Sequence, residues 1–293
     1  MSVTAFGVCW LCGPRLIKIL QANQLGQVVR SDGPKTHLNK QGTPTMGGVL
    51  IIIAVLISLV VWADLYNDWL QLLLASLIGF ACLGGVDDWQ KISANNSQGI
   101  SAKTKLFWQF ILAFVIMIVL YNKITVAAQH ELVIPFVESV SFDLGFWLVP
   151  FGAIVIVATS NAVNLTDGLD GLVTMPVVLV AFGLGVFAYY SMNVDLSQNA
   201  AVSLLPNISE VVIFCAALFG AGLGFLWFNA YPAQLFMGDV GSLALGASLG
   251  LVAVLVRQEL ILIIMGLVFV LEAMSVIIQV VCYKLTKKRV FKM

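Results

Sequence analysis

Apolar runs long enough to cross a lipid bilayer recur along this chain and limit its fold more than any other feature. Of its 293 residues, 60% are hydrophobic and 10% are charged, whereas average proteins carry about a quarter charged residues. A spanning helix needs about 20 mainly apolar residues. We expect complete spans over 47–64, 69–86, 106–121, 146–160, 172–192, 211–228, 241–256 and 260–282. The sequence predicts an all-α polytopic membrane protein with about eight complete transmembrane helices plus a partial first one over residues 3–12.

The basic residues gather in alternate loops. Thirteen of the fifteen Lys and Arg residues fall in 13–46, 87–105 and the tail from 284, which lie on one side if the spans alternate. By the positive-inside rule this side is cytoplasmic. The loops 161–171 and 229–240 then share that face. We therefore expect a single integral-membrane domain over 1–293, with its active site on the cytoplasmic face.

Five carboxylates also fall on the side of the membrane that is predicted to be cytoplasmic. Asp87, Asp88, Asp167, Asp170 and Asp239 occupy three of these cytoplasmic loops, next to glycines. Acids in the outer loops lack such Gly-bounded clusters and are interpreted as solvated charge. The topology thus predicts that the five clustered acids meet at one membrane face, close to lysines.

Asp239 stands alone between two apolar segments, in FLWFNAYPAQLFMGDVGSLALG at 225–246. A carboxylate before a helix start can ligate a cation, while the free N–H groups of the first turn hold anionic oxygens. The alternative is that Asp239 only caps the helix from Val240 onward.

Two further segments have a composition typical of a catalytic or binding site. Asp87 and Asp88 are adjacent at the end of a span, where their charges repel and oppose the helix dipole unless a cation such as magnesium lies between them. A headgroup-level charge cluster is the structural alternative. The second segment, NAVNLTDGLDGL at 161–172, is polar within an apolar stretch, although Asp170 could instead cap the next helix.

Four blocks together resemble one enzyme family: GTPTMGG at 42–48, VDDWQK at 86–91, NAVNLTDGLDGL at 161–172 and FNAYPAQLFMGDVGSLALG at 228–246. They are similar to the phospho-N-acetylmuramoyl-pentapeptide-transferases, within the polyprenyl-phosphate N-acetylhexosamine-1-phosphate transferase superfamily. The resemblance implies transfer of phospho-N-acetylmuramoyl-pentapeptide from its UDP derivative to undecaprenyl phosphate, which gives lipid I and UMP in peptidoglycan synthesis. It also implies a Mg²⁺ cofactor and a bacterial inner-membrane location.

Matching the motifs residue by residue implies the site. The catalytic group is Asp87, Asp88 and Asp239, with Asp239 and Asp167 as metal ligands. The substrate-binding set is Lys40, Thr45, Lys91, Lys105, Asn164, Asp167, Gly168, Leu169, Asp170, Asn229, Phe236 and Gln279. The partners are the two substrates and the lipid bilayer, with no nucleic acid, and a homodimer is left open.

The family has ten helices and a His-rich loop before the last. We expect this chain to begin partway into the first helix and to lack the His loop and the tenth helix, since its only histidines, His37 and His130, do not match the motif. Three alternatives follow: a sister transferase that uses N-acetylglucosamine, a catalytically inactive truncated membrane protein, and a transporter. A transporter predicts ionisable groups at mid-membrane, whereas the clustered acids lie at one face.

Overall fold

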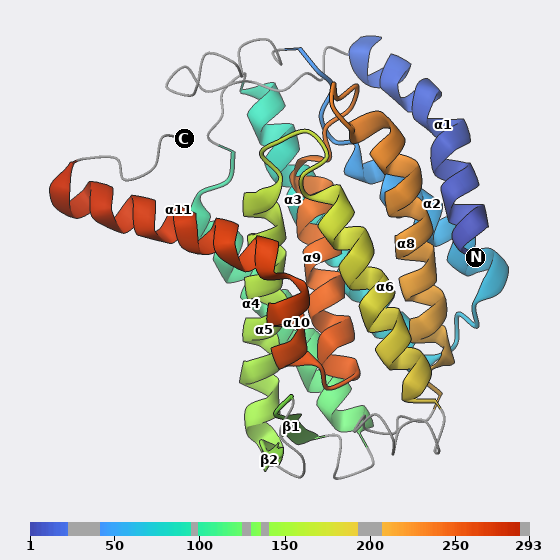
Figure 1. Ribbon diagram of the computed structural model, residues 1–293, viewed down its shortest axis with the longest axis vertical. Coiled ribbons are helices and arrows are strands. Elements are labelled where there is room, and N and C mark those ends of the chain that lie inside the picture. The colour runs from blue at the N-terminus through green and yellow to red at the C-terminus, as the bar shows by residue number, and fades with distance from the viewer. Residues whose placement is uncertain (23–41, 95–98, 125–129, 136–140, 193–206, 288–293) are drawn as a thin grey trace.

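The computed structural model describes residues 1–22, 42–94, 99–124, 130–135, 141–192 and 207–287 (Figure 1). Its helices are α1 (Ser2–Ala22), α2 (Gly48–Trp62), α3 (Asp68–Ser93), α4 (Ala102–Lys123), α5 (Leu148–Thr166), α6 (Thr174–Tyr190), α8 (Ser209–Asn229), α9 (Gly238–Leu255), α10 (Glu259–Met265) and α11 (Leu267–Thr286). Among the described residues, seven helices are long and apolar enough to cross a membrane, and α2 and α6 are shorter apolar helices. The predicted class of helical polytopic membrane protein is confirmed.

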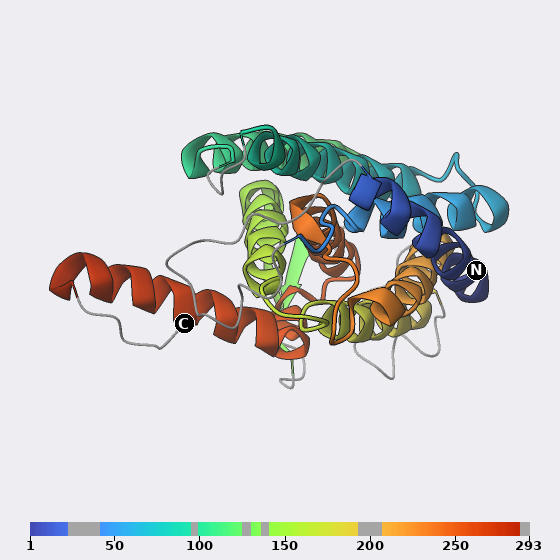
Figure 2. The ribbon, with the colours of Figure 1, turned by 90° about the horizontal axis from the view of Figure 1, so that it is seen from above.

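Helix α9 is the centre of the bundle. Every residue from Val240 to Leu255 is buried, and α9 packs mainly against α3 and α5 (Figures 1 and 2). Small residues make this possible, since a Cβ on Gly246 would lie only 2.7 Å from Ser160 Cα. Close approach through small residues is the usual way in which membrane helices associate. Asp239, in the first turn of α9, is therefore held by the most buried element of the fold.

Helix α1 is longer than the apolar piece 3–12 that the sequence predicted as the end of a span. It runs for 21 residues, through Pro14, to Ala22. Its second half is amphipathic: Ile17 and Leu20 are buried, while Arg15 and Lys18 are exposed. A search for continuous apolar residues misses an amphipathic helical segment of this kind, because charged residues interrupt the apolar run.

The span predicted over 260–282 is wrong as one helix. It consists of α10, only seven residues long, and α11, and Gly266 lies between them as the cap of both. A Cβ on Gly266 would lie 2.9 Å from the Leu262 carbonyl oxygen, so the backbone bends where no side chain is present. Helix α11 then leaves the bundle sideways (red in Figures 1 and 2), and only 6% of its apolar window is buried.

A small hairpin interrupts the otherwise helical chain between α4 and α5. Strands β1 (Glu131–Val133) and β2 (Ser141–Asp143) pair antiparallel, with Leu132 opposite Phe142, and the 3-10 turn η3 (Gly145–Trp147) leads into α5. The hairpin follows the end of α4, so it lies at the opposite end of the bundle from the start of α4 and from Lys105.

Candidate active site

Three of the predicted acids meet where α3 ends and α9 begins. Asp87 and Asp88 come from α3 and Asp239 from α9, and one oxygen of each lies within 4.8 Å of the other two. The helices approach closely here because Gly84 faces the α9 backbone, where a Cβ would overlap the carbonyl oxygen of Asp239. We call Asp87, Asp88 and Asp239 the acid cluster. The predicted convergence of these residues is confirmed, although Asp239 is 151 positions after Asp88 in the sequence.

Two predicted lysines complete the acid cluster. Lys105 Nζ lies 2.5 Å from Asp239 Oδ2 and 3.3 Å from Asp87 Oδ2. Lys91 Nζ lies 2.6 Å from Asp87 Oδ2 and 3.0 Å from Asp239 Oδ2. With all five groups ionised, three carboxylates face two ammonium groups, so the cluster keeps one formal negative charge. Lys91 remains about a third exposed, which leaves the cluster open to solutes at the end of the bundle.

The free N–H groups at the start of α9 are used differently from our prediction. Val240 N donates to Asp88 Oδ2 at 3.0 Å, and Gly238 N donates to Asp167 Oδ2 at 3.1 Å. Carboxylates of this chain therefore occupy two donors that we expected to hold anionic oxygens of a substrate. Asp88 and Asp167, rather than Asp239, satisfy the helix terminus.

Asp239 itself is turned toward the polar groups of other helices. Its Oδ1 accepts a hydrogen bond from Asn164 Nδ2 at 2.9 Å, and the same amide donates to Ser242 Oγ at 2.8 Å. Its Oδ2 faces the two lysines. This arrangement contradicts the capping alternative for Asp239, because none of these partners is an N–H group of the first turn of α9.

Asp167 lies beside the acid cluster but is not a member of it. Burial of the carboxyl group, together with the charges of Asp239 and Asp88, raises the pKa of Asp167 to about 7, against the smaller opposing effect of the Gly238 N–H. The protonation of Asp167 therefore depends on the charge held by the cluster. Of the two predicted metal ligands, the structure places Asp239 within the group of converging carboxylates and Asp167 next to it.

Asp170 and Asn229 hold the loop that precedes α9. Asp170 Oδ2 accepts from the Ala233 N–H at 3.1 Å, so it joins two loops, and no side chain caps α6. Asn229 is 1% exposed; its amide donates to the Leu235 carbonyl oxygen and accepts from Thr174 Oγ1. The described contacts of Asp170 and Asn229 hold the backbone of this loop and the first residue of α6. Gly168 and Leu169, which precede Asp170, are exposed.

The GTPTMGG turn packs directly against this loop. Phe236 N donates to the Pro44 carbonyl oxygen, and Gly47 N donates back to the Phe236 carbonyl oxygen at 2.8 Å. A Cβ on Gly238 would lie 3.0 Å from Thr45 Oγ1 and 2.7 Å from Asp88 Oδ2. Thr45 and Phe236 thus lie next to the acid cluster. Their contacts with substrate stay predictions.

The structure does not gather every predicted residue. Lys40 lies outside the described residues. Gln279 lies on α11, the helix that projects from the bundle (Figure 1), rather than on an element that borders the acid cluster.

Sequence reasoning missed two groups that support the site. The Ile100 N–H donates to Asp87 Oδ1 at 2.7 Å, next to Gly99, whose φ of +46° suits glycine. Gln109, on α4, accepts from Asn161 on α5 at 2.8 Å. The available signal for Gln109 was a single amide in an apolar run, one turn after Lys105.

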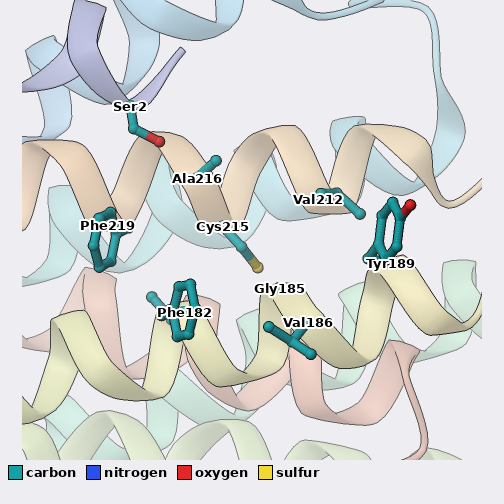
Figure 3. A pocket seen from close by; sticks show the side chains of 10 residues that line it. Ser2, Phe182, Gly185, Val186, Tyr189, Val212, Cys215, Ala216 and Phe219 are labelled. Carbon is teal, nitrogen blue, oxygen red and sulfur yellow. The ribbon is translucent and has the colours of Figure 1, made fainter.

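A separate hollow of about 300 Å³ lies between α6 and α8 against Ser2 (Figure 3). Phe182, Val186, Phe219 and Cys215 line it, and Tyr189 lies at its edge. Its residues belong to the halves of α6 and α8 that are remote from Asp170 and Asn229. The residues that line the hollow are mainly apolar, so this hollow differs in character from the acid cluster.

Comparison with known families agrees with this geometry. A family model described as glycosyl transferase family 4 matches residues 69–257, which include the acid cluster and both of its lysines. The phospho-N-acetylmuramoyl-pentapeptide-transferase signature 1 matches residues 40–52, which include the turn beside Thr45. The signature connects the chain with peptidoglycan synthesis. The chain therefore belongs to glycosyl transferase family 4, the polyprenyl-phosphate hexosamine-1-phosphate transferases, and is a membrane phospho-sugar transferase.

Proposed function

We propose that this protein transfers phospho-N-acetylmuramoyl-pentapeptide from its UDP derivative to undecaprenyl phosphate, giving lipid I and UMP. The observation that carries this proposal is the acid cluster with Lys91 and Lys105, held beside the turn that bears the signature. Phosphoryl transfer depends mainly on positioning and on neutralising charge. Both tasks suit a group of carboxylates and ammonium ions contributed by three helices.

The reaction exchanges one phosphorus–oxygen bond for another. An oxygen of the lipid phosphate forms a bond to the β-phosphorus, and the bond between that phosphorus and the oxygen retained by UMP breaks. Lys91 and Lys105 would hold phosphate oxygens. Asp87 or Asp88 would position the lipid phosphate or accept its proton.

The acid cluster also fits a divalent cation. Three carboxylates with converging oxygens form the hard donor set that Mg²⁺ prefers. Asp239, together with Asp87 and Asp88, would hold the ion, and Asp167 would adjust the local charge from outside the group. When bound, the cation neutralises charge that develops on the phosphate oxygens.

Uridine would bind on the side of the 167–173 turn, between the end of α5 and the start of α6. Asp170 and Asn229 fix the two loops relative to each other, while Leu169 is 49% exposed and Gly168 has open space around it. These two residues, with Asn164 and Phe236, would meet the nucleotide. Lys40 and Gln279 remain predicted substrate contacts.

We further propose that this end of the bundle faces the cytoplasm of a bacterial inner membrane. The distribution of basic residues in the sequence supports this orientation, and the UDP-linked substrate would be met on that side.

The test is UMP release by the purified chain in detergent with both substrates, with and without Mg²⁺. Wild-type protein is expected to release UMP only with Mg²⁺, and Asp239→Asn is expected to abolish release. UDP-N-acetylglucosamine should be a poor replacement for the muramoyl donor; if it is the better donor, the sister transferase is correct. If no donor gives UMP, the chain alone does not catalyse the reaction.

A further inference from the structure

One polar pair lies just below the acid cluster, inside the apolar part of the bundle. Asn161 Nδ2, on α5, donates to Gln109 Oε1, on α4, at 2.8 Å, and also to the Val157 carbonyl oxygen within its own helix. Gln109 is completely buried. This hydrogen bond joins the side chains of α4 and α5 directly.

The Gln109–Asn161 pair by itself lowers the stability of the fold. Gln109 Nε2 is buried and has no acceptor in the described part of the chain, and a buried donor without a partner lowers stability. An apolar side chain of similar volume would avoid that cost. Residues that break a local rule in this way are expected where function requires them.

The position of the pair relates it to the acid cluster. Gln109 is four residues after Lys105 on α4, and Asn161 is three residues before Asn164 on α5, so each is on the same helix face as a residue that contacts Asp239. At 1.5 Å per residue, the pair lies roughly one helical turn from those contacts.

A second bond fixes α5 at the same level. Ser160 Oγ donates to the Leu243 carbonyl oxygen of α9 at 2.9 Å, beside the close contact of Gly246 with Ser160. Neighbouring residues thus tie α5 to α9 and, through Asn161, to α4. Helices α4, α5 and α9, which meet at Asp239, are thus also joined about one helical turn away from Asp239.

We propose that Gln109 is a positioning residue of the acid cluster: through Asn161 it fixes the register of α4 against α5, so that Lys105 and Asn164 both reach Asp239. The register claim concerns the fold alone, whereas its effect on turnover rests on the proposed transferase function. Within the described part of the chain, the printed hydrogen bond of Gln109 is to Asn161 and not to the acid cluster, so Gln109 acts through the helices.

A thermal double-mutant cycle tests the register claim without activity. Melting temperatures of purified wild type, Gln109→Met, Asn164→Ala and the double variant are compared in detergent. If Gln109 supports the Asn164–Asp239 contact, the double variant loses less than the sum of the two single shifts. Separated sites without coupling give additive shifts, and additivity here would overturn the proposal.

The matched control is Ser76→Ala, another fully buried polar residue without a described partner, on α3. Its melting shift should add to that of Gln109→Met. Non-additivity of the same size with Ser76→Ala would show that the coupling is general and would also overturn the proposal.

Kinetics separate positioning from bulk stability. Well below its melting temperature, Gln109→Met should lower kcat about ten- to hundredfold, as loss of supporting groups does in metal sites, while KM for the UDP substrate changes much less. The exchanged pair Gln109→Asn with Asn161→Gln keeps one amide on each helix and should recover part of kcat. An unchanged kcat in Gln109→Met would overturn the positioning role. If the wild type itself releases no UMP, the proposed function fails, and the thermal cycle alone decides on Gln109.

Discussion

The two ends of helix α9 both carry ion pairs, but in opposite surroundings. At its start, Asp239 meets Lys91 and Lys105, and Lys91 is about a third exposed. At its far end, Arg257 Nη1 lies 2.8 Å from Glu259 Oε1, and both side chains are 1% exposed. The first group has an excess of largely buried carboxylates and reaches solvent mainly through Lys91, whereas the second is a balanced, closed pair. Excess charge with access to solutes marks the site, and a matched buried pair marks the scaffold.

The largest expected effect is on stability, at the closed end. Arg257→Met leaves the Glu259 carboxylate buried without its charged partner, which typically costs about 3–5 kcal/mol. We expect a large fall in the melting temperature of the purified protein, with kcat unchanged at temperatures where the variant is folded. Replacing both residues, by Arg257→Met with Glu259→Leu, should recover most of the loss. A loss of kcat in the folded variant would contradict the assignment of this pair to the scaffold.

The next effect is on activity, at the open end. Asp88→Asn removes a charge from the acid cluster, but its amide oxygen can still accept the Val240 N–H that Asp88 accepts now. We expect kcat for UMP release to fall about 10²- to 10³-fold, with little change in the melting temperature. The control is Asp143→Asn in β2, which likewise accepts a backbone N–H, from Gly145, and should keep full activity. Equal kcat in the two variants would disprove a catalytic role for Asp88.

A smaller effect is expected from the backbone that joins Asp88 to α9. Gly238 has a φ of +74°, and a Cβ there would meet Asp88 Oδ2 at 2.7 Å. Gly238→Ala should destabilise the protein by about 1–2 kcal/mol through the left-handed backbone and lower kcat about tenfold or more by shifting Asp88. Gly7→Ala in α1, where a Cβ has open space, should leave kcat unchanged and should stabilise the helix slightly, by about 0.5–1 kcal/mol. Wild-type kcat in Gly238→Ala would show that the position of Asp88 is not critical.

The smallest effect is expected at an exposed pair. Lys123 and Asp68 lie 2.5 Å apart, but their side chains are 35% and 55% exposed, and such pairs contribute about 0–1 kcal/mol. Lys123→Ala should leave kcat unchanged and lower the melting temperature only slightly. If Lys123→Ala lowers the melting temperature as much as Arg257→Met does, the exposure of an ion pair does not predict its contribution to stability.

Much of the fold could be predicted because apolar runs report on membrane helices directly. Span 69–86 lies within α3 and span 211–228 within α8, and alternation of these spans correctly brought Asp87, Asp88 and Asp239 together. The bend at Gly266 could not be read in the same way, because a glycine within an apolar run is compatible with both a straight and a broken helix. The amphipathic end of α1 was missed for the opposite reason, since its charges hide a helix.

The sequence by itself determined the membrane class, most of the spans and the set of acids and lysines at one end of the bundle, because hydropathy and motif identity are local properties. Only the tertiary structure decided how these groups are paired. It assigned the N–H groups of α9 to Asp88 and Asp167, turned Asp239 toward Asn164 and two lysines, and joined Gln109 to Asn161. These pairings depend on the register between helices. Close packing at Gly84 and Gly246 sets the register of α3 and α5 against α9.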